Sequence, residues 1–454
     1  MSQGSEMTGE ITNSQIEAFR EQFNSDSSAK VAQNAISNTE LSSVTLSRDL
    51  LQNMDFSFST KLDDWSVTNQ KRSGRCWLFA TLNLFRVGAM EKMKLKDFEF
   101  SQSHLHFWDK FERSNHFLEA IIETSDRPVD DRTTHFLLSD PIGDGGQWNM
   151  AMNLIRKHGL VPMSAYPESN SSSSTRPMNN VLKEFLRTSA SEIRSILEKG
   201  GAKEEARSHK ESRMSDIWKI LCIHLGTPPE NFDWQWRDKD GKFHRKGMMT
   251  PLEFAQEYVD IEWEDYVCVV NDPRNEYYKT YTVDYLQNVS GGPPVVYLNV
   301  PAEEMKEVTQ RLLENGTPVW MGCDVGKQME RKRGLWDANL FKLEELYGVE
   351  FGMEKADRLK FGQTMMTHAM LFTGVDVVDG KPRRWRVENS WGAENSGEKG
   401  FFTMNDNWFD EHMFEIAAPK EFLTDDMLSG LDTEPIVLPA WDPMGSLASQ
   451  EALG

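Results

Sequence analysis

Cys76 is the residue whose type and position most directly suggest covalent chemistry in this sequence. The preceding segment, 70–74, is polar and contains a glycine, whereas apolar residues recur at helical spacing after it (Leu78, Leu82 and Phe85). We therefore expect Cys76 in the first turn of a helix. Unpaired backbone N–H groups and the helix dipole favour a thiolate there, the form of cysteine that attacks a carbonyl carbon.

The other three cysteines, Cys222, Cys268 and Cys323, carry no such pattern. Free cysteine is among the most buried residue types, so we expect these three to be small apolar side chains. Four widely spaced cysteines are too few to staple a chain of 454 residues and too far apart for a metal pair. This usage favours a reducing compartment.

A thiolate nucleophile needs a partner that takes up a proton and returns it to the departing amine. Imidazole is suited to this role because its pKa lies near neutrality. Among the ten histidines, His368 stands out because it leads into an apolar run typical of a strand, and Asn389-Ser390-Trp391-Gly392 follows downstream. The other nine histidines lie in helical, loop or charged segments and are expected to be structural or surface residues.

These strings resemble the papain-like cysteine peptidases. In that family a glutamine six residues before the nucleophile donates to the oxyanion hole, an asparagine orients the histidine, and a tryptophan shields their hydrogen bond. The resemblance assigns these three roles to Gln70, Asn389 and Trp391, with Cys76 as nucleophile and His368 as acid and base.

Two further features connect the chain to this family. The segment 144–148 resembles the double-glycine segment beside the family's cleft, which implies that Gly145 and Gly146 bind substrate. The usual Cys-Gly-(Ser/Ala)-Cys-(Trp/Tyr) signature is altered at Ser73 and Arg75. Loss of the first cysteine removes a disulfide partner found in secreted relatives, in agreement with an intracellular enzyme.

The chain between Cys76 and His368 is about twice the ~130–150 residues usual in papain-like enzymes. This size matches the bleomycin hydrolases and related bacterial aminopeptidases, and the resemblance covers nearly the whole chain. It implies an α+β papain-like fold with a large helical insertion, a homohexameric barrel with internal active sites, and a C-terminal arm in the cleft. The matching segments are 98–103, 144–148, 322–327, 386–392 and 438–445.

The resemblance also implies the reaction. An arm whose terminal carboxylate meets the substrate's α-ammonium group would select short peptides with free N-termini, making the enzyme an aminopeptidase. Ala448 is expected to bind substrate at the end of the arm, and the amide of bleomycin and homocysteine thiolactone are implied substrates. Residues 449–454 extend past the usual end, so we expect trimming after Ala448 or deeper threading of the arm.

We divide the chain into five parts. They are an N-terminal helical segment (1–60), a papain-like helical half (61–167), an inserted helical or hook region (168–290), a β-rich half (291–430) and the arm (431–454). A capping box at Thr12 and Gln15 predicts an opening helix, and Asp240-Gly241 predicts a hairpin turn. Segment 168–175 is expected to be an exposed loop or a boundary. Further helices are expected at 178–226 and 302–313, and strands at 295–300, 319–325, 368–377, 385–388 and 401–404.

Composition limits the alternatives. The net charge of −21 disfavours nucleic acid as a partner, and no apolar stretch approaches the roughly 20 residues of a membrane span. With no apolar N-terminal segment either, we expect a cytoplasmic protein, and no motif calls for a metal or cofactor. Two alternatives remain open: an endopeptidase with a displaced arm, and a nucleic-acid-binding hexamer lined by the basic cluster at 237–246.

Overall fold

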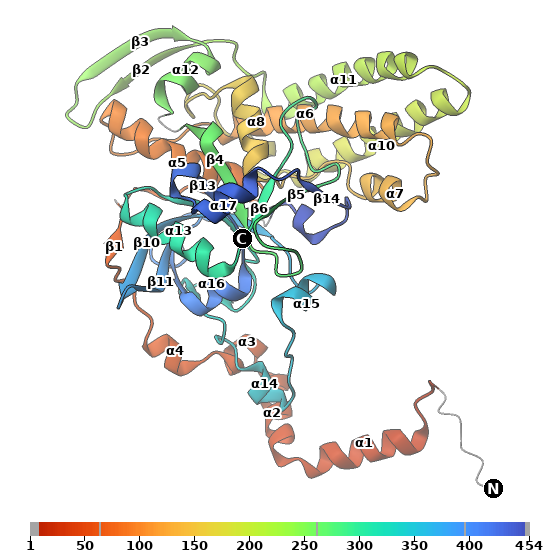
Figure 1. The fold of residues 1–454 in the computed structure, drawn as a ribbon, viewed down its shortest axis with the longest axis vertical. Coiled ribbons are helices and arrows are strands. Elements are labelled where there is room, and N and C mark those ends of the chain that lie inside the picture. Colours follow the sequence, from red (N-terminus) through yellow and green to blue (C-terminus); the bar gives the residue numbers. More distant parts are fainter. Residues whose placement is uncertain (1–8, 63–64, 260–261, 395, 450–454) are drawn as a thin grey trace. The chain divides into compact units, whose positions relative to one another are not determined.

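The computed structural model describes residues 9–62, 65–259, 262–394 and 396–449 (Figure 1). The chain divides into two compact units. The first comprises Met1–Met54 and Asn339–Met353, and the second comprises Asp55–Ala338 and Glu354–Gly454. Within the described residues, no helix is both long enough and apolar enough to cross a membrane.

The first unit is helical. Its opening helix has the capping box expected from the sequence: the Gln15 N–H donates to Thr12 Oγ1, and the Thr12 N–H donates to Gln15 Oε1. Neither of its two longest helices has a buried residue. The helices are α1 (Asn13–Ser25), α2 (Ser27–Asn38), α3 (Leu41–Thr45), α4 (Arg48–Gln52) and α14 (Leu343–Tyr347).

The central helix of the second unit is α5 (Cys76–Met93), which begins at Cys76 as predicted. The Arg75 carbonyl accepts hydrogen bonds from the N–H groups of Leu78 and Phe79, which closes the first turn. Because α5 packs against strands on one side and α6 and α8 on the other, its residues are buried almost all round. Lys94 ends the helix in a left-handed conformation.

A helical layer surrounds α5. Long helices α6, α10 and α11 pack together around an apolar cluster that includes Leu118, Leu186 and Ile217, and α10 and α11 confirm the helical prediction for 178–226. The helices of this layer are α6 (Gln102–Glu123), α7 (Arg132–Ser139), α8 (Trp148–His158), α9 (Asn170–Ser173), α10 (Arg176–Glu198), α11 (Lys203–Leu225) and α12 (Pro251–Tyr258).

The prediction of an exposed loop at 168–175 was wrong. Residues Asn170–Ser173 form the short helix α9, and Ser172 and Thr175 are buried. The Ser169 side chain caps α9, and Glu168 pairs with a buried arginine of the nucleophile loop. A serine-rich composition suggested solvent exposure, but the Ser169 hydroxyl accepts from the Ser172 N–H, and the Ser172 hydroxyl donates to Glu168.

The predicted hairpin is confirmed. Strands β2 (Phe232–Arg237) and β3 (Phe243–Met249) pair antiparallel, with Asp240 and Gly241 in the turn. Asp238 Oδ1 accepts from the N–H groups of Asp240 and Lys242, which fixes the turn.

In the described part of the chain, twelve strands form one mixed sheet in the order β14-β5-β6-β4-β13-β7-β10-β11-β12-β9-β8, with β1 on β10. Strands occur at all five predicted places. The strands are β1 (Thr60–Lys61), β4 (Tyr266–Val270), β5 (Lys279–Val283), β6 (Tyr297–Asn299), β7 (Val319–Cys323), β8 (Met329–Glu330), β9 (Leu335–Trp336), β10 (His368–Val378), β11 (Lys381–Glu388), β12 (Phe401–Asn405), β13 (Met413–Pro419) and β14 (Ile436–Leu438).

The remaining helices accompany the sheet. Helix α13 confirms the prediction at 302–313 and packs on β10 and β13 through Met305, Leu312 and neighbouring apolar residues. These helices are α13 (Ala302–Glu314), α15 (Lys355–Lys360), α16 (Asp406–His412) and α17 (Asp425–Leu431), with short 3-10 turns at Trp263–Asp265, Lys420–Phe422 and Pro443–Gly445.

Candidate active site

Strand register brings His368 and Asn389 together. Strands β10 and β11 form an antiparallel pair in which Leu371 lies opposite Glu388. His368 is the first residue of β10, and Asn389 directly follows the last residue of β11, so both lie at the same end of this pair. The sequence separation between the two is therefore the length of one hairpin.

The nucleophile candidate faces this end of the sheet. Helix α5 packs against β10 and β7, and Cys76 at its start is fully buried. Cys323, whose Cα pairs with that of His368, is close enough to Cys76 for the two thiols to interact electrostatically. Burial, with smaller contributions from Asp324 and Cys76, raises the pKa of the Cys323 thiol well above its usual range. Cys323 therefore stays protonated, and it keeps the apolar character expected of it.

The hydrogen bonds of Asn389 fix the tautomer of His368. Asn389 Oδ1 accepts from the Ser390 N–H at 2.8 Å and lies 2.9 Å from His368 Nε2. A carbonyl oxygen can only accept, so Nε2 must carry the hydrogen of the neutral ring. The lone pair then resides on Nδ1, which is buried without a hydrogen-bond partner. His368 is thus held as a base whose acceptor atom is not consumed by the surrounding protein.

Burial also controls the charge of His368. Removal from water disfavours the imidazolium form and, against the opposing effect of the Asn389 hydrogen bond, lowers the His368 pKa to about 4. Trp391 covers the site, with its ring centroid 4.9 Å from that of His368. The shielding role expected of Trp391 is consistent with this packing, because a tryptophan ring excludes water from the imidazole–carboxamide bond.

Hydrogen bonds fix the side chain of Gln70 next to Ser390, the residue that follows Asn389. Its Oε1 accepts from Ser390 Oγ at 2.6 Å, and its Nε2 donates to the Ser73 carbonyl at 2.6 Å. The backbone N–H of Gln70 also donates to the Ser390 carbonyl. These contacts orient the carboxamide so that its nitrogen, the donor expected at an oxyanion hole, points toward the loop that precedes Cys76.

A buried carboxylate holds the nucleophile helix against the histidine strand. Glu388, at the end of β11, accepts hydrogen bonds from Asn83 and Arg86 of α5, each at 2.8 Å, and from the Trp65 indole. Burial raises the pKa of Glu388, and Arg86 opposes this shift by favouring the charged form. These contacts join α5 to β11, and Glu388 directly precedes Asn389 in the chain.

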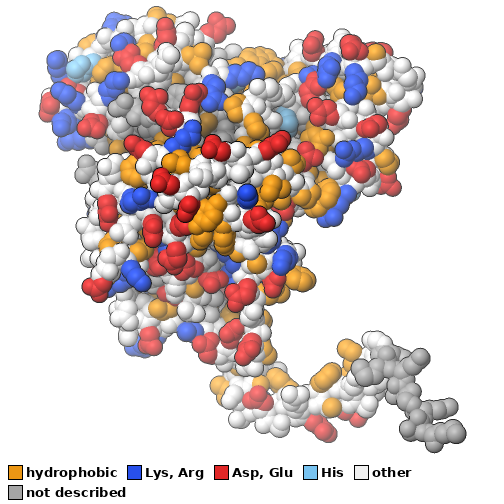
Figure 2. All heavy atoms as spheres, in the orientation of Figure 1, with side chains coloured by type: hydrophobic (Ala, Val, Ile, Leu, Met, Phe, Trp, Pro, Cys, Tyr) orange, Lys and Arg blue, Asp and Glu red, His pale blue; other side chains and the backbone are white. Residues whose placement is uncertain are grey.

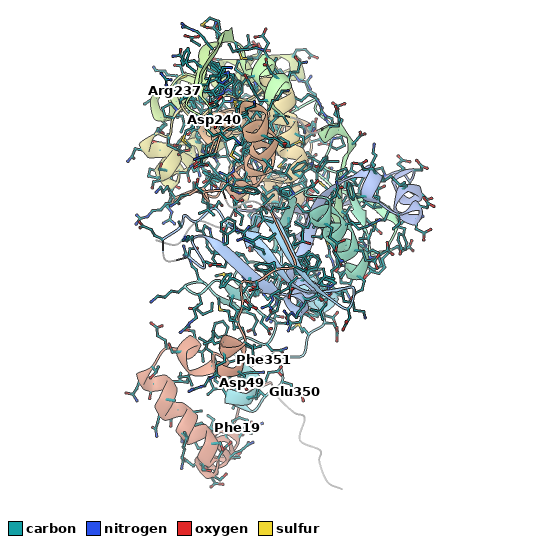
Figure 3. All side chains as sticks on the ribbon, turned by 90° about the vertical axis from the view of Figure 1, so that its left-hand side faces the viewer. Phe19, Asp49, Arg237, Asp240, Glu350 and Phe351 are labelled. Atoms are coloured by element: carbon teal, nitrogen blue, oxygen red, sulfur yellow. The ribbon has the colours of Figure 1, made fainter. Side chains whose placement is uncertain are left out.

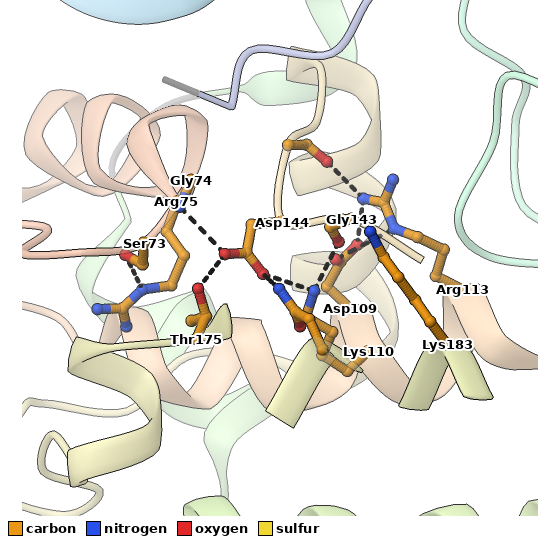
Figure 4. Close-up of polar contacts among 12 residues, drawn as sticks. Ser73, Gly74, Arg75, Asp109, Lys110, Arg113, Gly143, Asp144, Thr175 and Lys183 are labelled. Atoms are coloured by element: carbon orange, nitrogen blue, oxygen red, sulfur yellow. Dashed lines mark hydrogen bonds and ion pairs between the residues drawn. The ribbon is translucent and has the colours of Figure 1, made fainter. Parts of the chain in front are cut away.

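A second buried carboxylate holds the loop before Cys76 (Figure 4). Asp144 Oδ2 accepts from the Gly74 N–H at 3.1 Å and from the Thr175 hydroxyl, while Oδ1 accepts from Lys110 Nζ at 2.6 Å and from Asn179 at 2.8 Å. Burial opposes ionisation, but Lys110 holds the pKa of Asp144 well below its usual range. One charged group therefore connects the nucleophile loop, α6 and α10.

The side chain of Arg75 adds a further anchor to this loop. Its guanidinium is fully buried and makes two parallel hydrogen bonds to Glu168, both 2.9 Å, and a third to Ser73 Oγ. Although burial opposes it, the Arg75 charge lowers the pKa of Glu168. Arg75, one of the two residues that depart from the papain signature, thus joins the loop to Glu168, which precedes α9.

The C-terminal arm lies against the predicted substrate-binding glycines. The Gly146 N–H donates to the Ala448 carbonyl, and the Ser449 N–H donates to the Thr367 carbonyl, next to His368. A Cβ atom on Gly145 would come within 2.9 Å of the Ala448 oxygen, so only glycine permits this approach. Ala448 is fully buried. The arm therefore lies along Gly145 and Gly146, and Ser449 lies against Gly74, two residues before Cys76.

The structure joins the predicted site residues in two groups. His368 contacts Asn389 and Trp391, and Gln70 bonds to Ser390 between those two residues. Gly146, next to Gly145, bonds to Ala448, while Cys76 begins the helix that packs against the His368 strand. Residues 450–454, where the predicted extension continues, lie outside the described part. In the residues the structure describes, no group of three or more histidine, cysteine or acidic side chains could hold a metal ion.

Sequence reasoning missed the groups that position the site, namely Asp144, Lys110, Glu168 and Glu388. Asp144 lies in a segment that resembles the family, but the resemblance assigned a role only to the two glycines of that segment. No local pattern marks a buried ion pair, because its partners come from elements far apart in the chain. An acidic residue directly beside a predicted catalytic string, as in Glu388-Asn389, was the one available signal.

Comparisons with known proteins find a matching family, similar sequences and a similar crystal structure. Residues 10–445 match a model of the Peptidase C1-like family. The chain is 42% identical over 450 residues to bleomycin hydrolase of Rattus norvegicus, covering 96% of this chain and 99% of that protein. It is 41% identical over 447 residues to aminopeptidase C of Lactobacillus delbrueckii subsp. lactis, covering 97% and 99%. The crystal structure of pepw from Lactobacillus rhamnosis HN001 superposes with a TM-score of 0.95 at 40% identity, covering 97% of this chain and 100% of that one.

Proposed function

The chain belongs to the Peptidase C1-like family and is a papain-like cysteine aminopeptidase, and we propose that Cys76 is its nucleophile and His368 its general acid and base. The tautomer of His368 supports this assignment, because a buried Nδ1 lone pair is available at the end of the strand that α5 packs against.

The reaction follows from this proton acceptor. The Cys76 proton moves to His368 Nδ1, and the thiolate sulfur bonds to the carbonyl carbon, whose π electrons move onto oxygen. When the oxyanion collapses, the C–N bond breaks and the departing amine takes the proton from His368. Water then attacks the thioester, gives a proton back to His368 and displaces the thiolate, which regenerates the enzyme and releases the acid.

The oxyanion is assigned to two donors, the Gln70 side-chain amide and the Cys76 backbone N–H. The bonds of Gln70 to Ser390 and Ser73 support this role, because a donor that is fixed before substrate arrives needs little reorganisation. The Cys76 N–H belongs to the first turn of α5, where backbone N–H groups have no acceptor within the helix. Asn389 holds the imidazole, and Trp391 keeps water from their bond.

The position of the arm is the single observation that supports an aminopeptidase over an endopeptidase. Residues Ser446 and Ser449 bond to Met366 and Thr367, so the arm occupies the groove where residues upstream of the scissile bond would otherwise lie. A substrate must then begin at the arm, with its α-ammonium group near the arm's end. We propose that trimming after Ala448, or displacement of residues 449–454, opens this space.

Matched peptides test this proposal. An unblocked peptide and its acetylated twin are compared in kcat/KM, with the intact mass of the protein measured on the same sample. We expect at least a ~100-fold preference for the free N-terminus, because acetylation removes the charge and adds bulk where the arm ends. Equal rates, with cleavage inside the acetylated peptide, support the endopeptidase alternative with a displaced arm. Active protein that still ends at Gly454 contradicts trimming.

The substrate class is short peptides with broad side-chain tolerance. We also propose the bleomycin amide and homocysteine thiolactone as substrates, because each presents an acyl carbon beside a free amino group, as an N-terminal residue does. The name bleomycin hydrolase of the rat relative supports the first of these. Hydrolysis of each compound by wild type, and its loss in Cys76→Ala, tests the assignment.

A homohexamer is proposed because the family resemblance implies one, and exposed apolar residues of the N-terminal unit support self-association. Phe19 and Val31 are 57% and 68% exposed, and Phe351 is 52% exposed, although α1 and α2 bury none of their own residues (Figure 3). Short helices are marginal in water without packing, so we expect these surfaces to pack against further copies of this chain. Light scattering of Phe19→Ser should give a smaller mass than wild type, and Gln22→Ser on the same helix serves as control.

Nucleic-acid binding by the basic hairpin is the less favoured alternative. Figures 2 and 3 show basic side chains over β2 and β3, including Arg237, but acidic ones lie among them. Arg245 pairs with Asp233 and Lys246 pairs with Glu257, each at 2.5 Å, which reduces the charge left for phosphates. Salt-dependent retention of DNA by protein alkylated at Cys76 would favour this alternative.

Because all four cysteines are free thiols, we propose a cytoplasmic location, which fractionation of cells can test.

A further inference from the structure

Arg331 lies against the tryptophan that covers the catalytic histidine. Its guanidinium carbon is 4.5 Å from the centroid of the Trp391 ring, which in turn packs on His368. The charge of Arg331 reaches the imidazole, since it contributes to lowering the His368 pKa. Among the described residues, Arg331 is the charged side chain that acts on the His368 pKa, and no step of the mechanism above uses it.

Within the described residues, no carboxylate lies within ion-pair distance of Arg331, whereas Arg333, two residues further on, reaches Glu330 at 3.9 Å. The side chain is half-buried, while its neighbours Lys332 and Arg333 are exposed. Arginines withdrawn from water are usually paired with an anion, so a half-buried unpaired guanidinium is suited to an anion that arrives with a ligand.

The segment 69–74 shows on which side of the scissile bond this cation lies. Asn69 bridges to Trp391, Gln70 bonds to Ser390, and Gly74 lies against Ser449 of the arm. The segment therefore runs from the Trp391 wall to the arm, with Cys76 following it. Because the arm occupies the half of the groove upstream of the scissile bond, the Trp391 wall belongs to the downstream half, where the departing amine leaves.

From this arrangement we propose that Arg331 binds the C-terminal carboxylate of a short leaving group, so that dipeptides and tripeptides are preferred substrates. The inference rests on the proposed aminopeptidase function and narrows its substrate class. In a dipeptide the carboxylate lies about one residue length, ~3.8 Å, beyond the scissile bond. A guanidinium stacked on an indole is held in position and can donate two parallel hydrogen bonds to a carboxylate.

The test compares two substrates that differ only at the carboxylate. A dipeptide and its C-terminal amide are assayed with wild type, Arg331→Gln and Arg331→Lys, and the ratio of their kcat/KM values is the readout. A charge-assisted bond of this kind contributes ~10- to 100-fold. We expect wild type to prefer the free acid by about that factor, Arg331→Gln to bring the ratio close to one, and Arg331→Lys to retain part of the preference.

Two controls separate this inference from its premise. Lys332→Gln removes the same charge from the exposed neighbouring position and should keep the wild-type ratio. An aminoacyl coumarin amide has no carboxylate, so its hydrolysis by wild type tests the aminopeptidase function alone. A ratio near one in wild type, or the same ratio in wild type and Arg331→Gln, overturns the role of Arg331. Equal losses on the dipeptide, its amide and the coumarin amide also overturn it, by assigning Arg331 to the support of Trp391.

Discussion

The two sides of the active site are built on opposite principles. On the nucleophile side, the loop before Cys76 is held by charged groups that are nearly all paired, with Asp144 bonded to Gly74 and Lys110, and Arg75 bonded to Glu168. On the histidine side, a single hydrogen bond and the Trp391 ring surround an imidazole whose Nδ1 has no partner.

This difference follows from what each side has to do. An oxyanion hole depends on donors that do not move, and a buried network of satisfied polar groups provides such rigidity. A base must keep its acceptor atom available, so additional hydrogen bonds to His368 Nδ1 would compete with the cysteine proton. The rigid ion pairs on the nucleophile side and the unbonded Nδ1 atom of His368 on the histidine side are therefore complementary.

Removal of the nucleophile should have the largest effect. We expect Cys76→Ala to lower kcat by about 10⁶-fold, the scale of loss when the nucleophile of such a catalytic unit is removed. Hydrolysis of an unblocked aminoacyl coumarin amide measures it. Cys222→Ala, at a half-buried cysteine given no catalytic role, serves as control. Near-normal hydrolysis by Cys76→Ala would show that the two sides described above do not form a catalytic centre.

Loss of the fixed donor on the nucleophile side comes next. Gln70→Ala should lower kcat by roughly 10² to 10³, because it removes one of two oxyanion donors. KM should change less, since the donor acts mainly on the charge that develops in the transition state. Pre-steady-state acylation rates measure the effect. A change confined to KM would assign Gln70 to substrate binding and not to the oxyanion.

Breaking the Asp144–Lys110 ion pair tests whether a rigid loop before Cys76 is needed for stability and for kcat. Asp144→Asn leaves Lys110 without its charged partner and should destabilise folding by about 3–5 kcal/mol, with kcat lower by about 10-fold. Urea unfolding and kcat on the folded fraction measure these effects. Asp140→Asn is a matched control, because Asp140 pairs with Lys183 at an exposed position, where such a pair contributes at most about 1 kcal/mol. Equal destabilisation by both variants contradicts a special role for the Asp144 network.

The histidine side predicts the smallest effect, a shift in pH dependence. His368 must be neutral to accept the cysteine proton, and its pKa is about 4, so activity should fall as the pH drops through that region. In Asn389→Asp, a carboxylate beside Nε2 favours the imidazolium and raises the His368 pKa. The acidic limb of kcat/KM should therefore move to higher pH by about one unit or more. If the acidic limb of kcat/KM stays where it is in Asn389→Asp, His368 is not the group whose titration the limb reports.

Much of this centre could be predicted because its signals are local. The polar segment followed by a helical stripe placed Cys76 at a helix start, and the apolar runs after His368 and before Asn389 predicted strands. The approach of His368 and Asn389 was predicted by the family resemblance. Capping at Thr12 and the Asp240-Gly241 turn were equally local, and the structure confirms both. The serine-rich segment 168–175 misled because composition reports polarity and not burial.

The amino-acid sequence by itself determined the order and spacing of the reactive side chains, since helix starts, strand ends and turns depend on a few neighbouring residues. Only the tertiary structure decided which charges would pair inside the protein and that Arg331 would stack on Trp391. These contacts join residues from separate elements, and packing selects them from many partners of similar chemistry. For this reason no periodicity or motif in the sequence could indicate them.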